Sequence, residues 1–275
     1  VDDLQRVEVI RGPQSAMFGR STFGGAVNFV TKTPSFEPRG RVMISAAEDA
    51  DYEVTASYEG GLIEDRLAVR VGARLYDFGG QYRSAADGGR LGQQSTKMIH
   101  GTLFAQATEQ LTIRLSARFF EDDDGPVAGY YLGGTYGKCG AFSGPSAPTG
   151  PAYSSTAFFC DELPKVDLAA RGPNTIVTPE IRSIFLDNDL NYGPLQDAPK
   201  LDGIGLLRRS FFSSLAMDYS FGDGWMFTSN TGYTDEDTSN LRDWDLTPVY
   251  GWYASGPQVS ESLSQEFRVQ SPSDG

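Results

Sequence analysis

The stretch RLAVRVGARLYD, residues 66–77, decides the fold class because its side chains alternate between apolar and polar with a period of two. One face is apolar and the other is basic: Leu67, Val69, Val71, Ala73 and Leu75 against Arg66, Arg70 and Arg74. This is the period of a β-strand that has one face in an apolar medium. A run of about twelve residues is longer than the roughly five or six of most globular strands, and it approaches the length of a tilted membrane-spanning strand.

The same pattern recurs along the whole chain. It predicts eight strands, at about 39–48, 51–60, 66–77, 97–107, 111–121, 207–220, 225–236 and 262–270. Every second connection is tight, at 61–65, 108–110 and 222–224. Those between them are mostly long, at about 78–96, 122–206 and 237–261, with a short first one near Asp49. Tight turns at one rim and long loops at the other are typical of an outer-membrane β-barrel.

The composition narrows the class of protein. The chain carries 23 basic and 36 acidic residues, a net charge of −13, and so lacks the basic surface that nucleic acids require. No stretch approaches the roughly 18 consecutive apolar residues of a membrane helix, whereas barrel strands keep average hydropathy low. One histidine, His100, and two cysteines leave little material for a catalytic or metal site, so we predict neither, and no cofactor.

A soluble β-sandwich is the alternative, since it also needs one apolar face on each strand. The connection at 122–206 is too long for an ordinary sandwich. Aromatic residues also gather near the strand ends, as in the interfacial girdles of membrane barrels: Tyr52, Tyr58, Tyr76, Trp225 and Tyr233. These features favour a membrane β-barrel over a soluble β-sandwich.

The two cysteines, Cys139 and Cys160, lie in the long connection, without the spacing of a zinc site. They are either a disulfide or two free thiols, and their shared irregular loop favours the disulfide. Such a bond indicates an oxidising compartment, for example a cell surface or a periplasm.

The first 35 residues differ from the rest. Residues 7–34 read VEVIRGPQSAMFGRSTFGGAVNFVTKTP, two short apolar strands separated by a glycine-rich connection. This segment resembles the end of the plug domain of TonB-dependent outer-membrane receptors, which carry an RGP run after a short strand, a (Y/F)G pair, and GG(A/V)(V/I)N. The matching residues are Glu8, Arg11, Gly12, Pro13, Phe18, Gly19, Gly24, Gly25, Asn28, Thr31 and Lys32. The stretch at 264–268, SQEFR, also resembles a barrel strand of these receptors.

The resemblance implies a mainly all-β fold: an antiparallel transmembrane β-barrel segment of about eight strands, preceded by part of an αβ plug domain. Residues 1–35 are then the C-terminal part of the plug, and residues 36–275 the N-terminal part of the barrel. Family barrels have about 22 strands around a plugged lumen. We therefore expect the TonB box, the first half of the plug and about fourteen strands to lie outside this chain.

The implied function is uptake of a scarce ligand, such as a ferric siderophore, across the outer membrane of a Gram-negative bacterium. The implied partners are TonB with its inner-membrane energising complex, the ligand, and outer-membrane lipid and lipopolysaccharide; the protein is not an enzyme. The alternative is a soluble or surface β-rich ligand-binding module without transport activity.

The resemblance also implies roles for particular residues. Five side chains are expected to face the lumen: Arg70, Arg74, Arg114, Arg118 and Glu266. The four arginines either pair with plug carboxylates or contact ligand. The family counterpart of Arg11 pairs with carboxylates on the barrel wall. Aromatic residues of the long loop either bind ligand or pack the loop on itself: Tyr130, Tyr131, Tyr136, Phe158 and Phe159. His100 is expected to be a structural residue facing the lumen.

Overall fold

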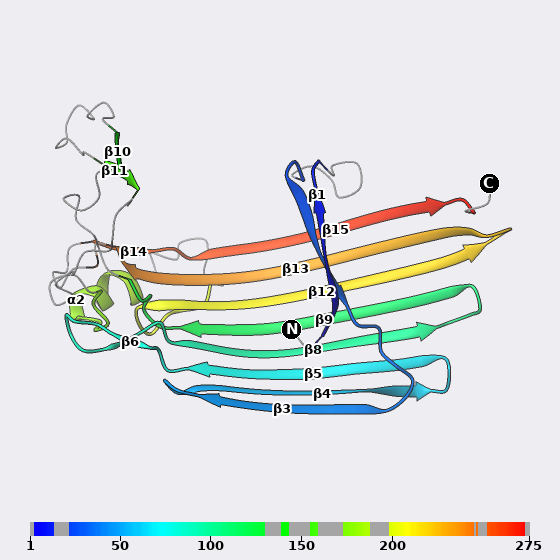
Figure 1. Cartoon of the computed structure of the whole chain (residues 1–275), viewed down its shortest axis with the longest axis horizontal. Helices are drawn as coiled ribbons and strands as arrows, with labels where there is room; N and C mark the ends of the chain where they lie inside the picture. The colour runs from blue at the N-terminus through cyan, green and yellow to red at the C-terminus, as the bar shows by residue number, and fades with distance from the viewer. Residues whose placement is uncertain are drawn as a thin grey trace.

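The computed structural model describes residues 3–13, 22–129, 139–142, 155–158, 173–187, 198–244, 246 and 252–272. One broad antiparallel sheet dominates it, in the order β14-β13-β12-β9-β8-β5-β4-β3, with β15 also paired to β13 (Figure 1). The strands are β3 (Arg39–Ala47), β4 (Asp51–Ile63), β5 (Leu67–Phe78), β8 (Gln94–Gln106), β9 (Leu111–Asp124), β12 (Gly205–Phe221), β13 (Trp225–Asp243), β14 (Tyr253–Ser255) and β15 (Gln258–Gln270). The predicted all-β fold class is confirmed.

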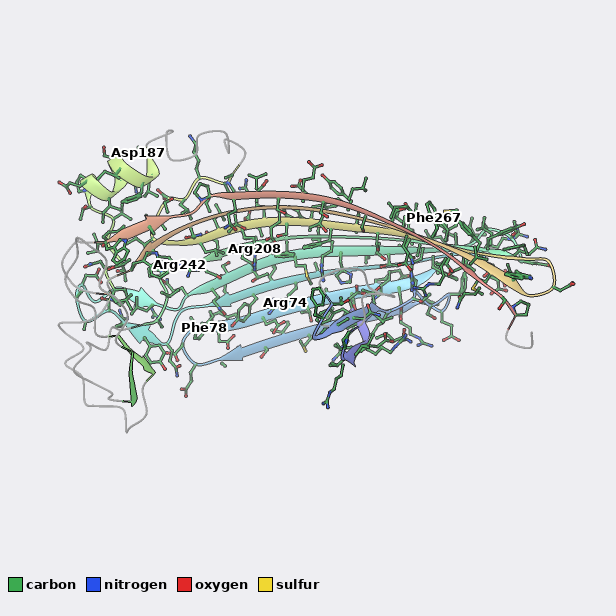
Figure 2. The ribbon with its side chains drawn as sticks, turned by 90° about the horizontal axis from the view of Figure 1, so that it is seen from above. Arg74, Phe78, Asp187, Arg208, Arg242 and Phe267 are labelled. Atoms are coloured by element: carbon green, nitrogen blue, oxygen red, sulfur yellow. The ribbon has the colours of Figure 1, made fainter. Side chains whose placement is uncertain are left out.

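The sheet is an open, curved wall rather than a closed barrel (Figure 2). Over the described residues, β3 forms one edge, and β14 and β15 form the other. All eight predicted strands are present. Several of them run further than the pattern predicts, and β13 shows the largest difference, since it spans 19 residues and ends at Asp243 rather than near residue 236. Its added end, DTSNLRD, is mostly polar, so the alternation gives little signal there.

The connections follow the predicted asymmetry. At one rim the chain reverses within a few residues, and the positive φ of Asp65, Gly222 and Gly224 there allows the sharp turns. At the opposite rim, which we call the loop rim, longer segments carry short elements of their own. These are β6 (Tyr82–Arg83), β7 (Arg90–Leu91), β10 (Cys139–Phe142), β11 (Ser155–Phe158), α2 (Pro179–Ile181) and η2 (Arg182–Leu186).

A separate hairpin crosses the sheet steeply instead of joining it (Figure 1). It consists of β1 (Leu4–Arg11) and β2 (Gly25–Thr31). We call the sheet face against which it lies the hairpin face, and the opposite one the outer face.

The outer face is strongly apolar and exposed. Its large side chains have exposed fractions between 39% and 74%: Val42, Ile44, Val54, Tyr58, Val71, Leu75, Ile99, Leu103, Leu115, Phe119, Leu263, Phe267 and Val269. The cross-strand register places these residues side by side, for example Val54 opposite Leu75 and Leu103 opposite Leu115. A continuous apolar surface of this extent requires an apolar surrounding, as a lipid bilayer provides.

The only cluster of buried apolar side chains found among the described residues lies at the loop rim, around Ile181, Leu186, Leu201, Ile204 and Leu241. It packs the long connection onto the ends of β12 and β13. No described helix is long and apolar enough to cross a membrane.

Candidate functional site

The hairpin and the residues next to it hold the described part of the plug-like motif. Glu8 lies directly opposite Asn28, whose Nδ2 donates to Glu8 Oε2 at 2.9 Å. Arg6 Nε donates to the other carboxylate oxygen at 2.6 Å. These hydrogen bonds, that of Asn28 first, hold the pKa of Glu8 below its ordinary value.

The far end of the hairpin is shaped by glycine. Gly25 has φ +140°, and a Cβ there would lie 2.3 Å from the carbonyl oxygen of Ile10. Gly12 has φ +84°, and its N–H donates to Gly24 at 3.3 Å. These positions need the conformational freedom of glycine, and Arg11 pairs with Gly25 in the register just before them. Pro13 follows the strand directly, and Gly19 lies outside the described residues.

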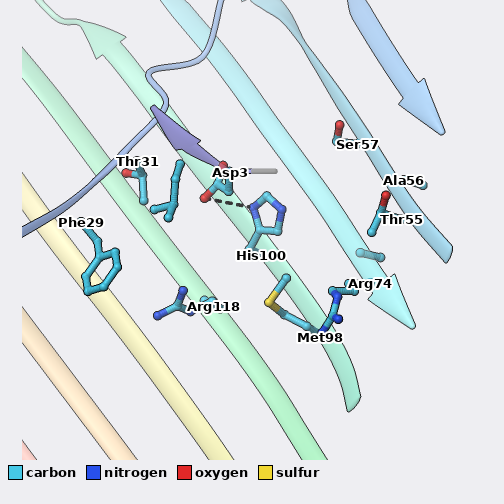
Figure 3. Close-up of a pocket in the computed structure, with 12 residues that line it drawn as sticks. Asp3, Phe29, Thr31, Thr55, Ala56, Ser57, Arg74, Met98, His100 and Arg118 are labelled. Carbon is cyan, nitrogen blue, oxygen red and sulfur yellow. Dashed lines mark ion pairs between the residues drawn. The ribbon is translucent and has the colours of Figure 1, made fainter. Parts of the chain in front are cut away.

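An ionic cluster fastens the start of the hairpin to the wall. Arg70 Nε donates to Asp3 Oδ1 at 3.0 Å, and Arg70 Nη1 lies 3.3 Å from Glu59 Oε2. The Arg70 side chain is only 6% exposed. The His100 Nδ1 atom lies 3.5 Å from the second oxygen of Asp3 (Figure 3). A buried guanidinium with two carboxylates is a strongly coupled contact, since removing one partner leaves charge without compensation.

Gly72 makes room for His100 in this cluster. The two residues are cross-strand neighbours, and a Cβ on Gly72 would lie 2.3 Å from His100 Nε2. The imidazole therefore lies over the bare backbone of β5, with its side chain 7% exposed. His100 is a packed wall residue, and its contact with Asp3 joins the wall to the hairpin.

The register places all five predicted lumen-facing residues on the hairpin face. Arg74 Nε donates to Glu53 at 2.7 Å, and Arg114 donates to the hydroxyl of Thr33 at 3.4 Å. Glu266 accepts from Arg268 Nη2 at 2.7 Å. The guanidinium of Arg118 instead lies over the ring of Phe212, 5.2 Å from its centroid.

Two adjoining cavities separate the hairpin from the wall. The first has a volume of about 360 Å³ and lies between Asp3 and Phe29 of the hairpin segment and Arg74, Met98 and Arg118 of the wall (Figure 3). The second, of about 290 Å³, shares Asp3, Phe29 and Arg118, and extends over β12 and β13. Their volumes lie near the lower end of the range for small-molecule sites.

Hydroxyl groups dominate the rest of the lining: Thr31, Thr55, Ser57, Thr102, Ser116, Ser214, Thr234, Ser262 and Ser264. Among the described residues, no group of three or more His, Cys, Asp or Glu side chains is arranged to hold a metal ion. The lining can therefore offer hydrogen bonds and charge to a passing molecule.

A second structured region closes the loop rim. Asp87, in the connection between β6 and β7, accepts hydrogen bonds from Thr175 N at 2.6 Å, Ile176 N at 3.2 Å and Gly89 N at 2.9 Å. Burial opposes the ionisation of Asp87, but the backbone hydrogen bonds of Thr175 and Gly89 outweigh it and lower its pKa. The residues from 173 to 176 are therefore fixed to a neighbouring loop.

Asp243 holds the same segment from the other side. Its Oδ2 atom accepts from both the backbone N–H and the side-chain amide of Asn174, at 2.9 and 3.1 Å. Tyr130, Tyr131, Tyr136 and Phe159 lie outside the described residues, and of Phe158 only the backbone, opposite Cys139 in the β10–β11 pair, is described. Cys160 also lies outside, so the disulfide stays a prediction.

Several important residues carried no signal in the sequence. Asp3 precedes the recognisable motif, and Glu59 and Gly72 are ordinary members of alternating strands. Phe120 and Phe212 stack at a centroid distance of 5.8 Å, although they are 92 positions apart on strands that flank the long loop. For the residues within strands, only the periodicity pointed in the right direction, because it assigns them to the polar face.

Comparison with known proteins shows which proteins this chain is similar to. No family model matches the chain. It is 28% identical over 128 residues to the ferrichrome outer membrane transporter/phage receptor of Escherichia coli, covering 46% of this chain and 16% of that protein. It is 30% identical over 139 residues to the ferric enterobactin receptor of Pseudomonas aeruginosa, covering 43% and 18%.

Comparison of structures points to the same kind of protein as comparison of sequences. The structure matches the ferric yersiniabactin uptake receptor FyuA of Yersinia pestis with a TM-score of 0.63 at 18% identity, over 97% of this chain and 33% of that one. It matches the siderophore receptor PiuA of Acinetobacter baumannii with the same TM-score at 13% identity, over 97% and 32%. The chain is therefore similar to TonB-dependent outer-membrane receptors, in sequence over part of its length and in fold over almost all of it.

In the receptors that the chain resembles, a plug lies inside a barrel; below we use plug for the hairpin, barrel for the wall and lumen side for the hairpin face as terms of the proposal. The relatives are outer-membrane receptors of Gram-negative bacteria. The relatives are receptors and transporters rather than enzymes. The chain spans about a third of the length of the solved receptors that it matches.

Proposed function

We propose that this chain is part of an active outer-membrane transporter that takes up a scarce ligand, such as a ferric siderophore, with energy delivered through TonB. The plug hairpin fastened inside the wall is the observation that carries this proposal. A purely adhesive or passive β-protein has no need of a separate hairpin whose buried charges pair with the inner face of its sheet.

The arrangement supports a division into two parts. Residues 1–35 provide the end of the plug, and residues 36–275 provide the first part of the barrel wall. Among the described residues, the contacts between them include polar ones: the cluster around Asp3 and Arg70, the hydrogen bond from Ser35 N to Glu59, and the contact of Arg114 with Thr33. Polar contacts can be exchanged for water when the plug is pulled, at a lower cost than an apolar interface of the same area.

The loop rim supports ligand capture outside the membrane. Hydrogen bonds to Asp87 and Asp243 fix the position of residues 173–176 at the loop rim. We place the predicted aromatic contacts in the same long loop, with Cys139 and Cys160 bonded. Lipid and lipopolysaccharide are the partners of the outer face.

Paired measurements on the full-length protein test the transport function. Equilibrium binding of ferric siderophores to outer membranes is measured beside their accumulation in cells, with and without a proton uncoupler. We expect binding to persist and accumulation to stop when the uncoupler is present. Uptake that ignores the uncoupler would indicate a passive pore, and binding without any uptake would indicate a surface binding module.

A variant that lacks most of residues 125–200 tests ligand binding separately from insertion of the protein into the membrane. We expect the variant to insert and to keep its heat-modifiable gel migration, because these residues lie outside the long strands of the wall. Its ligand binding should fall at least tenfold. Unchanged binding would show that this loop does not capture the ligand.

A further inference from the structure

One short segment of the long connection is bound to two separate turns at the loop rim. We call residues 173–176 the strap. The backbone N–H groups of Thr175 and Ile176 donate to Asp87 Oδ2, in the turn between β6 and β7, at 2.6 and 3.2 Å. The Thr175 hydroxyl donates to the other oxygen of the same carboxylate at 3.0 Å. The strap therefore engages both oxygens of Asp87.

The preceding residue of the strap is bound to the end of β13. The backbone N–H and the side-chain amide of Asn174 both donate to Asp243 Oδ2, at 2.9 and 3.1 Å. The second oxygen of Asp243 accepts the N–H of Leu246 at 3.1 Å, within the turn that follows β13. Asp243 is thus shared between the strap and its own turn, as Asp87 is.

The strap has little freedom to move at one attachment without moving at the other. Asn174 and Asp243 are only 3% and 4% exposed. Ser84, in the β6–β7 turn, is equally buried and donates its hydroxyl to the carbonyl of Pro173 at 2.6 Å. Consecutive Cα atoms are about 3.8 Å apart, so one rigid peptide unit separates the residue bound to Asp243 from the first residue bound to Asp87. A shift of the strap at one carboxylate therefore displaces it at the other.

Gly89 lets the β6–β7 turn approach the strap closely. Its N–H donates to Asp87 Oδ1 at 2.9 Å, and a Cβ at this position would overlap the side chain of Thr175. The approach therefore requires a residue without a side chain. A larger residue here would displace the strap and leave both carboxylates in place.

We propose that the strap couples the β6–β7 turn to the turn after β13, so that the two turns open locally as one cooperative unit. Such coupling is reciprocal, because the factor by which opening at Asp87 favours opening at Asp243 must equal the factor in the reverse direction. The consequence for ligand capture, that a ligand which orders one turn also orders the other, rests on the transport function proposed above.

Hydrogen–deuterium exchange of the full-length protein in outer-membrane vesicles, read at single amides, tests the coupling without a ligand. The two reporters are the amides of Leu246 and Gly89, each bound to the carboxylate of its own turn. We expect Asp87→Ala to raise exchange at Leu246 about tenfold, the size expected when a hydrogen bond to a charged group is lost. Asp243→Ala should raise exchange at Gly89 by a similar factor.

Two milder variants guard against a folding defect in the alanine variants. Asp87→Asn keeps one acceptor oxygen and should give a smaller rise at Leu246. Gly89→Ala displaces Thr175 without removing a carboxylate, and it should raise exchange at Leu246 as well.

Two matched controls separate coupling from general loosening of the long connection. Asp202→Ala removes a carboxylate that is fully exposed and lies 3.3 Å from Arg182. Gly203→Ala adds a Cβ where no atom lies within 4 Å. Neither should change exchange at Gly89 or Leu246.

Exchange that rises only in the turn that carries the substitution would overturn the proposal. A rise of the same size in the amides of β5 would overturn it as well, since the wall and not the strap would then be loosened. Failure of the full-length protein to bind any ferric siderophore would instead refute the capture function, and it would leave the exchange result unaffected.

Discussion

Gly72→Ala tests whether the absence of a side chain at one position of β5 makes room for the His100 imidazole, which joins the wall to the plug. The added Cβ would lie 2.3 Å from His100 Nε2, 2.9 Å from Cε1 and 3.1 Å from Cδ2. Ordinary carbon contacts begin near 3.5 Å, so the ring must retreat by about 1 Å. The ring is 7% exposed and lies against Asp3, so a shift into the adjoining cavity would disrupt its contact with Asp3.

The expected cost follows from that geometry. Overpacking of a filled site costs about 1–3 kcal/mol. Replacing a strand glycine by alanine returns roughly 0.5–1 kcal/mol where space is available. We therefore expect a net loss of about 1–2 kcal/mol in the free energy of unfolding, together with a weaker hold on the hairpin.

Gly101 provides the matched control. It lies beside His100 on β8, and a Cβ there would meet nothing closer than 3.8 Å. Gly101→Ala should be neutral or slightly stabilising. The double variant Gly72→Ala/His100→Ala should recover most of the loss relative to His100→Ala alone, because the clash has gone.

The assay is equilibrium unfolding by urea in lipid vesicles, followed by tryptophan fluorescence and heat-modifiable gel migration. Equal costs at Gly72 and Gly101 would refute the reasoning. A Gly72→Ala cost that persists in full without the imidazole would refute it as well, since the loss would then arise in the backbone.

Three further predictions concern the membrane face, the loop rim and the long loop. Val71→Arg should cost about 2–4 kcal/mol of unfolding free energy, whereas Ser214→Arg, on the lumen side, should cost less than about 1 kcal/mol; equal costs would reverse the two faces. Asp87 has a lowered pKa in the folded state. Its contribution to the stability of the folded state is therefore complete above the pKa of the unfolded state, near 4, and is lost as the pH falls through the lower pKa of the folded state. Hydrogen-exchange protection of the amides bound to Asp87 should therefore fall over that acidic window, and a pH-independent protection would contradict this. Mass spectrometry of non-reduced peptides should find Cys139 linked to Cys160, a bond worth about 3 kcal/mol for a loop of roughly 22 residues, and two alkylatable thiols would exclude it.

The sequence determined the strands and their faces because alternation is a local property of the chain. A residue such as Val71 has its side fixed by its neighbours, and a slip by one position would turn every apolar side chain into the lumen. The motif at residues 7–34 was equally local, since Gly25 and Asn28 act through the shape of a single hairpin. For these features no knowledge of distant contacts was needed.

Only the tertiary structure decided which polar side chains share a partner. Arg70, Arg74, Arg114 and Arg118 are indistinguishable in the alternating pattern, yet just one of them lines a cavity without a carboxylate at ion-pair distance among the described residues. The difference comes from where the hairpin crosses the sheet, which brings Asp3 to Arg70 across 67 positions of sequence. Such pairings depend on the angle and depth of packing between two separate elements, and periodicity within either element carries no information about them.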